Sequence, residues 1–328
     1  MKILMIGGTQ FVGRHMAAEV LDRGHELTLF HRGKTNPGLF PEAREVLGDR
    51  MTDLERLGEE WDVVIDTCGY FPRQVRLSGE HLKDRVGRYV FISTISVYRD
   101  FSREGVDEKA YVKTLEDPEL EELNWSTYGP LKTECEGVID GIYQDRAFVI
   151  RPGVIAGPWD STDRFTYWAW RVAQGGKVLA PGPAEANIQV IDARDLARWV
   201  VDGVEVARRG TYNAAGPQMS FSEMLDACRR GVDVEAEFVW ASPEQLREWE
   251  LDDTQKMPLW NEEGDGRKAG MYAVDSSKAV AEGLTYRPLE ETARDTVAWA
   301  ESCVEDHDWQ VGLDLLKEQE YVRSLLEE

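Results

Sequence analysis

The sequence predicts an α/β protein of the Rossmann type, with a doubly wound parallel sheet and a smaller, discontinuous C-terminal lobe. Short apolar runs bounded by turn residues alternate with helical patterns through the first half of the 328 residues. A glycine-rich turn follows the first of these runs. Strands that alternate with helices indicate a parallel sheet covered on both faces.

The expected elements follow in chain order. Residues 2–6 form a buried strand, and Val12, Met16 and Val20 then repeat at helical spacing until Gly24 ends the helix. The further strands are expected at 26–30, 44–47, 62–66, 88–93 and 147–151. After Pro158 tryptophans and mixed polar segments appear, interrupted by sheet-like pieces at 188–192 and 211–215.

This pattern predicts two unequal domains. Residues 1–158 form the sheet domain, to which about 186–215 return, and 159–328 are mainly a substrate-binding lobe. The tryptophans of this lobe, Trp168, Trp170 and Trp260, are expected in its core rather than as platforms for a sugar.

The charge balance weighs against anionic partners. The 61 acidic against 38 basic residues give a net charge of -23, typical of a salt-adapted acidic surface, and such a field repels phosphate backbones and anionic lipids. Nucleic acid is therefore an improbable partner, and a membrane is not expected.

The cysteines and histidines indicate neither a disulfide framework nor a metal site. The four cysteines form no CxxC pattern, and the five histidines are scattered. The chain starts directly with a strand-like segment and has no long apolar run, so we expect a cytoplasmic protein.

The segment GGTQFVG, residues 7–13, joins the first strand to the first helix. Such a turn lets backbone N–H groups and the helix N-terminus face a pyrophosphate, although tight turns also use glycine for geometry alone. At the end of the second strand, where a carboxylate would hold the free ribose hydroxyl of NAD, the chain has His31 and Arg32. A guanidinium suits a 2′-phosphate, so NADP is favoured over NAD, with a merely exposed Arg32 as the alternative.

Tyr128 and Lys132 are four residues apart, on one face of a predicted helix that Ser126 or Thr127 could cap. A nearby ammonium stabilises phenolate, which would let tyrosine exchange a proton near neutral pH. Such spacing is common by chance. It gains weight here because STISVY, residues 93–98, places hydroxyls at the carboxyl end of a strand, where open α/β sheets bind ligands.

Together, the glycine turn, the hydroxyl-rich strand end and YxxxK resemble the short-chain dehydrogenase/reductase superfamily, in its extended branch of epimerases, dehydratases and reductases. The resemblance implies that Tyr128 is the general acid/base, that Lys132 holds the nicotinamide ribose and lowers the tyrosine pKa, and that Thr94 orients the substrate oxygen. It also implies a set of cofactor contacts. These are Gly7, Gly8, Thr9, Gln10, Phe11, Val12, Gly13, Arg32, Asp49, Arg50, Cys68, Gly69, Lys132, Pro152 and Val154.

Three positions depart from the family's pattern. Gln10 stands where GxxGxxG has its middle glycine, so its side chain is expected to point away from the pyrophosphate. His31 replaces the NAD-selecting Asp, and Asp192 replaces a His that is usual in the epimerases. The variant GGTxFxG also resembles atypical members that include chloroplast stem-loop RNA-binding proteins.

Two functions therefore compete. The first is an NADP- or NAD-dependent enzyme that transfers hydride at a carbinol or carbonyl carbon of a small molecule such as a nucleotide sugar, with Asp163, Arg164 and Gln189 as substrate-binding candidates that could equally be surface groups. The second is an RNA-binding or regulatory protein on the same scaffold. The resemblance is also compatible with a homodimer.

Overall fold

The structure is a computed structural model that describes residues 1–117, 119–261, 270–303 and 307–327. Its centre is a seven-stranded sheet in the order β11-β6-β5-β4-β1-β2-β3, in which every neighbouring pair is parallel. The strands are β1 (Lys2–Ile6), β2 (Glu26–His31), β3 (Arg44–Leu47), β4 (Trp61–Asp66), β5 (Val86–Ile92), β6 (Ala147–Pro152) and β11 (Gly210–Ala214). The predicted doubly wound fold is confirmed.

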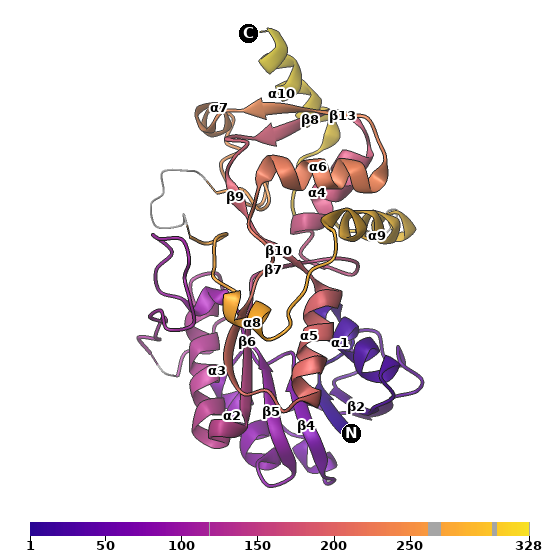
Figure 1. Ribbon diagram of the computed structural model, residues 1–328, viewed down its shortest axis with the longest axis vertical. Helices are drawn as coiled ribbons and strands as arrows, with labels where there is room; N and C mark the ends of the chain where they lie inside the picture. Colours follow the sequence, from indigo (N-terminus) through magenta and orange to yellow (C-terminus); the bar gives the residue numbers. More distant parts are fainter. Residues whose placement is uncertain (118, 262–269, 304–306, 328) are drawn as a thin grey trace.

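Helices cover both faces of this sheet (Figure 1). On one face α1 (Phe11–Asp22) packs against α5 (Ala193–Glu205), and Met16 and Trp199 are buried there with the sheet side chains. On the other face α2 (Pro72–Leu82) packs against α3 (Tyr128–Tyr143), where Val75 and Ile139 are buried. The strands are apolar almost throughout because both of their faces are covered.

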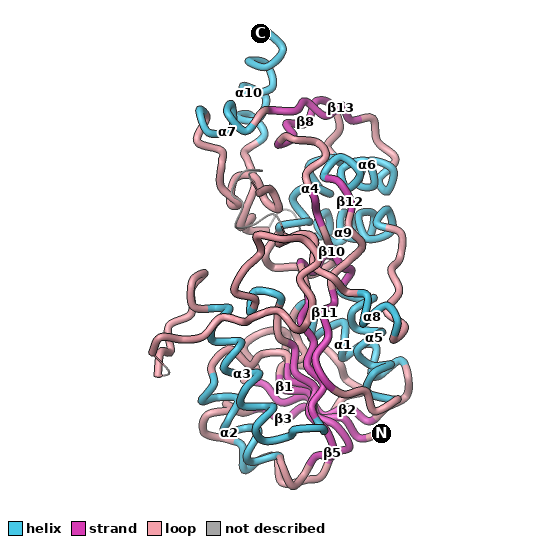
Figure 2. Tube along the Cα trace, turned by 60° about the vertical axis from the view of Figure 1, so that its left-hand side comes forward, coloured by secondary structure: helices cyan, strands magenta, loops and turns pink. Residues whose placement is uncertain are grey.

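The second lobe has its own core at the opposite end of the molecule (Figures 1 and 2). It contains α4 (Arg164–Ala173), α6 (Phe221–Val232), α7 (Pro243–Glu248), α9 (Leu289–Cys303) and α10 (Leu315–Glu327), with the parallel pair β8 (Gly176–Pro181) and β13 (Ala236–Ala241). Capping boxes begin two of these helices, Ser220 with Glu223 at α6 and Ser242 with Gln245 at α7. Trp168 and Trp260 are fully buried in this core, and Trp170 packs against Trp309.

Short strands connect the two lobes. β7 (Val154–Ala156) pairs with β10 (Val190–Asp192), and β9 (Asn187–Ile188) pairs with β12 (Met219–Ser220). The strand expected at 188–192 is therefore divided at Gln189, because the chain changes its pairing partner there. The sheet domain also receives α8 (Ser277–Ala281), whose Ala279 is buried with the α1 and α5 side chains, a return that the sequence did not indicate.

Candidate active site

A pocket of about 600 Å³ opens at the carboxyl ends of β1 and β4, where the strand order reverses. Open α/β sheets bind their ligands at this kind of position. Most of the predicted cofactor residues line it. They are Gly7, Gly8, Thr9, Gln10, Phe11, Val12, Gly13, Arg32, Asp49, Arg50, Cys68, Lys132 and Pro152, together with Tyr128.

The glycine turn has the geometry that a dinucleotide needs. Gly7 and Gly8 both have φ +97°, which L side chains rarely adopt, and a Cβ on Gly7 would come 2.5 Å from Thr67 Oγ1. A Cβ on Gly13 would come 2.9 Å from the Gly8 Cα, so only glycine lets α1 start this close to the turn. These glycines therefore let the turn pack tightly against the sheet, so that its backbone and the N-terminus of α1 line the pocket.

Gln10, the departure from the glycine pattern, is the N-cap residue of α1 but makes no side-chain cap. Its Nε2 instead donates to Ser161 Oγ at 3.4 Å, across the pocket. The same segment is held to α1 by Trp159, whose ring lies 3.7 Å from the Arg14 guanidinium carbon. The glutamine therefore connects the turn to the second lobe.

At the end of β2, the exposed Arg32 lines the pocket beside Lys34 and Thr35. The neighbouring His31 is engaged, because its Nδ1 accepts from the Gly33 N–H at 3.1 Å and its Nε2 lies 2.9 Å from Glu45 Oε1. The end of β2 therefore presents the cations Arg32 and Lys34 at the place where a carboxylate would select NAD over NADP.

Asp49 and Arg50 form the next part of the wall. The Asp49 carboxylate accepts from the Met51 N–H at 2.9 Å. Arg50 is buried and its guanidinium donates to Asp66, at 2.8 and 3.2 Å, and to Ser78. Burial alone would raise the pKa of Asp66, but the Arg50 cation holds it below its usual value. The charged end of Arg50 is therefore held by Asp66 and Ser78, although the residue lines the pocket.

Lys132 lines the pocket and is only 3% exposed. Its Nζ donates to the carbonyl oxygens of Gly69 at 2.8 Å and Ile92 at 2.7 Å, which leaves one ammonium proton for a ligand. Burial lowers its pKa. Gly69 thus contributes through its carbonyl, and burial raises the pKa of the adjacent Cys68 thiol to about 11.

Tyr128 is the first residue of α3 and stands at the pocket. Its placement depends on Gly129, where a Cβ would come 2.1 Å from the Ser96 carbonyl oxygen, so glycine lets the helix start against the strand end that carries Thr94. Burial raises the pKa of Tyr128, while a hydrogen bond with Thr94 and the charge of Arg164 act in the opposite direction. This corrects the expected direction of the shift, because burial outweighs the two effects that favour phenolate, and Lys132 is not one of them.

The start of α3 also differs from expectation. Thr127 is the N-cap residue, but its side chain makes no capping hydrogen bond. Asn124 instead fixes the turn before the helix, since its Oδ1 accepts from Ser126 N at 2.9 Å and Thr127 N at 3.1 Å. Pro130 lies in the first turn, as expected.

Val154 and the three substrate candidates are placed differently from the other predicted residues. Val154 is buried in the core of the second lobe, and the next residue, Ile155, lines the pocket instead. Gln189 is buried, and its amide bonds to Gly216 and Val274 backbone. Asp163 is fully buried and accepts from His307 and the Gln310 N–H. Of the three substrate candidates, only Arg164 acts on the site, because its charge opposes the rise in the pKa of Tyr128.

Sequence reasoning missed several pocket residues. Tyr70 lines the pocket, and its ring centroid lies 5.6 Å from Lys132 Nζ. Thr162 belongs to the segment that faces the glycine turn. The position of Tyr70 could have indicated its role, because it directly follows Cys68 and Gly69, which were already predicted to contact the cofactor.

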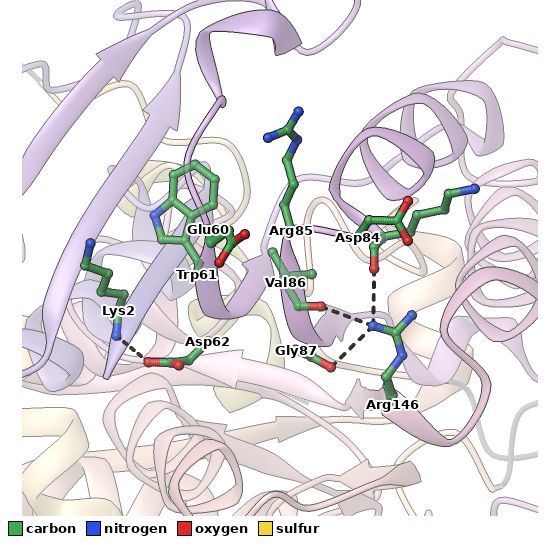
Figure 3. A pocket seen from close by; sticks show the side chains of 10 residues that line it. Lys2, Glu60, Trp61, Asp62, Asp84, Arg85, Val86, Gly87 and Arg146 are labelled. Atoms are coloured by element: carbon green, nitrogen blue, oxygen red, sulfur yellow. Dashed lines mark hydrogen bonds between the residues drawn. The ribbon is translucent and has the colours of Figure 1, made fainter.

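A second pocket lies at the opposite, amino-terminal edge of the sheet (Figure 3). Its lining mixes cations such as Arg85 with carboxylates such as Asp84, and Arg146 Nη1 is occupied by backbone carbonyls, including that of Val86 at 3.1 Å. None of the predicted site residues lies there.

The described residues contain neither a cluster of metal ligands nor a membrane-spanning helix. Among residues 1–117, 119–261, 270–303 and 307–327, no three His, Cys, Asp or Glu side chains gather as metal ligands. In the same ranges no helix combines the length and apolarity needed to cross a bilayer.

The sheet order defines a Rossmann-type fold, and comparison with solved structures confirms it. The chain is similar to the Bordetella bronchiseptica enzyme WbmH in complex with NAD+, with a TM-score of 0.65, 18% identity, and coverage of 92% of this chain and 98% of that one. It is also similar to UDP-glucose 4-epimerase with UDP-glucose from Thermotoga maritima, with a TM-score of 0.65, 18% identity, and coverage of 93% and 100%.

In sequence, the chain is similar to the chloroplast stem-loop binding protein of 41 kDa b from Arabidopsis thaliana. The two are 25% identical over 277 residues, which cover 75% of this chain and 67% of the relative. No protein-family model matches the chain.

Proposed function

We propose that the protein is an NAD(P)-dependent oxidoreductase of the extended short-chain dehydrogenase/reductase type, with NADP as the preferred coenzyme. The observation that carries this proposal is a pocket at the switch point that is lined both by the glycine turn and by Tyr128 and Lys132. A regulatory or RNA-binding protein would have no need to keep a phenol and an ammonium beside a dinucleotide-sized cavity.

The residues present suit a dinucleotide. The turn at Gly7 and Gly8, which lines the pocket with positive φ angles, would receive the pyrophosphate on backbone N–H groups. Arg32 would fork onto a 2′-phosphate at the end of β2, with Lys34 beside it. When bound, the nicotinamide ring accepts or donates a hydride.

The chain's own part in the reaction is to hold and move a proton. Tyr128 would take the proton from a substrate carbinol, or return it to the oxygen of a carbonyl, through its phenolic oxygen. The hydrogen bond with Thr94 and the charge of Arg164 both favour phenolate. Lys132 would donate a hydrogen bond from its third ammonium N–H to a ribose hydroxyl, because the other two donate to backbone carbonyls.

A nucleotide sugar or a related small molecule is the substrate class that we propose. One of the structural relatives supports it, since the UDP-glucose 4-epimerase from Thermotoga maritima was solved with UDP-glucose. Arg164 was predicted to bind the substrate, and its charge opposes the rise in the pKa of Tyr128. Its guanidinium would bind a phosphate or carboxylate of such a molecule.

The test is a screen of nucleotide sugars, ketones and secondary alcohols with NADPH, NADP, NADH and NAD, read by nicotinamide absorbance and by product analysis for redox-neutral epimerisation. At least one substrate should turn over with wild type and fail with Tyr128→Phe. Turnover that survives this substitution would remove the tyrosine from the mechanism.

RNA binding is the second candidate, favoured by the sequence similarity to the stem-loop binding protein. The net charge of -23 opposes it, because RNA affinity depends mainly on cations that neutralise phosphates. Filter retention of stem-loop RNA at graded salt separates the two candidates. Tight, salt-dependent retention without coenzyme binding would favour RNA.

A further inference from the structure

A second cluster of reactive side chains lies in the C-terminal lobe, at the end of α9. Cys303 is the last residue of that helix, and its Sγ lies 4.0 Å from Nδ1 of His307. On the other side of the imidazole ring, Nε2 lies 2.9 Å from Oδ1 of Asp163. A thiol, an imidazole and a carboxylate are therefore arranged in a row, apart from the residues that line the dinucleotide pocket.

The order of these contacts determines the role of each nitrogen. Asp163 is fully buried, and its second oxygen accepts from the Gln310 N–H at 3.0 Å, so the carboxylate is fixed as an acceptor. Nε2 must then carry hydrogen and donate to it, which leaves the lone pair of Nδ1 toward Sγ. The ring is also held edge-on by Trp299, at 5.6 Å and 87°, and by Trp309, at 4.7 Å and 78°.

This is the arrangement that activates a sulfur nucleophile, with a base next to the thiol and a third group that orients the base. Cys303 Sγ also lies 3.4 Å from the Trp299 carbonyl oxygen, but a carbonyl cannot remove its proton and an imidazole can. Among the described residues, Asp160, in the segment that leads into α4, interacts electrostatically with the Asp163 carboxylate and with Arg164.

We propose that Cys303 is a reactive thiol that exchanges with external disulfides, with His307 as its base and Asp163 as the residue that orients that base. His307 takes the thiol proton, and the thiolate attacks one sulfur of the disulfide. The new sulfur–sulfur bond forms as the old one breaks, and the leaving thiolate takes the proton back from the imidazolium. The products are a mixed disulfide on Cys303 and one free thiol.

The other cysteines provide an internal contrast. Burial raises the pKa of Cys68 to about 11 and the pKa values of Cys135 and Cys228 to about 12. Cys135 and Cys228 are also closed to solvent. These thiols should react slowly at neutral pH, so the first thiol to exchange in the folded protein should be Cys303.

The test uses the folded full-length chain with 4,4′-dithiodipyridine, a neutral disulfide whose exchange releases a coloured thione, between about pH 5.5 and 8.5. One thiol should react in a fast phase, and peptide mapping should place it at Cys303. The phase should disappear in Cys303→Ser and remain in the matched control Cys228→Ser. At about pH 6, His307→Gln should slow it at least tenfold, since an unassisted thiol near pKa 8.5 is almost fully protonated there.

Asp163→Asn should slow the exchange as well, because the amide no longer favours hydrogen on Nε2. If either variant unfolds, the pH profile of the wild type decides alone. A rate that stays nearly level below pH 7 supports the proposal. A rate that falls tenfold for each pH unit, or labelling at Cys68 first, overturns it.

Discussion

Asp160, beside the pocket, should make the stability of the protein depend on pH in a way that one substitution removes. Its side chain is fully buried; Oδ1 accepts from the N–H and hydroxyl of Thr162, and Oδ2 has no hydrogen-bond partner in the part of the chain that the structure describes. Burial raises its pKa to about 6, against the opposing charge of Arg164. The two Thr162 contacts shape the segment that faces the glycine turn.

The sign follows from the two states of the chain. An aspartate in the unfolded chain titrates near pH 3.9, so between about pH 4 and 6 the folded form binds the proton more tightly. The stabilising effect is complete below the unfolded pKa and is lost as pH rises through about 6. The shift of about two pKa units corresponds to about 3 kcal/mol, of which roughly half is lost between pH 5 and 8.

Asp160→Asn removes this titration. The amide introduces its own buried N–H, a cost of about 1–3 kcal/mol that does not change with pH. The free energy of unfolding of the variant, minus that of the wild type, should therefore increase by about 1.5 kcal/mol from pH 5 to pH 8. Urea unfolding at fixed salt, followed by the fluorescence of the 11 tryptophans, measures it. The exposed control Asp252→Asn should show no such change, and an equal difference at both pH values for Asp160→Asn would refute the reasoning.

Three further predictions concern the coenzyme, the catalytic tyrosine and the second lobe. Arg32→Ala should lower the affinity for NADPH roughly tenfold to a hundredfold, as expected for a lost charge-assisted hydrogen bond, and the affinity for NADH much less. The exposed control Arg76→Ala should change neither affinity. Equal losses for the two coenzymes would remove the NADP assignment. Tyr128→Phe should retain NADPH affinity but lower turnover by about two to four orders of magnitude, while Tyr111→Phe, at a tyrosine 88% exposed, should be silent. Glu318→Ala should lower the free energy of unfolding by about 3–5 kcal/mol, because it leaves the buried Arg171 without its carboxylate partner. The control is Glu59→Ala, which removes an ion pair at the surface. An equally small loss in both variants would contradict the burial of the Arg171 and Glu318 pair.

The sheet domain was predictable because its signals are local. The apolar runs at 2–6 and 62–66 belong to strands buried on both faces, and the glycine turn stands between a strand and a helix, as its function requires. The same local signals located the pocket walls, since strand ends of a parallel sheet meet at one edge.

The rest depends on contacts between distant residues. The sequence showed neither that Arg50 would meet Asp66 in the interior nor that Asp163 would be closed off by His307, 144 residues later. Gln189 has the polarity of a cleft residue but holds three backbone groups together. For the same reason the pKa of Tyr128 was expected to fall: helical spacing placed Lys132 beside it, and only the structure directs the ammonium to the Gly69 and Ile92 carbonyls.

The most direct test of the central claim is a titration of the wild-type protein with NADPH and NADH, followed by the fluorescence of the reduced nicotinamide. The account predicts saturable binding with one site per chain, tighter for NADPH than for NADH. No saturable signal with either coenzyme, in a protein that is folded by circular dichroism, would contradict it.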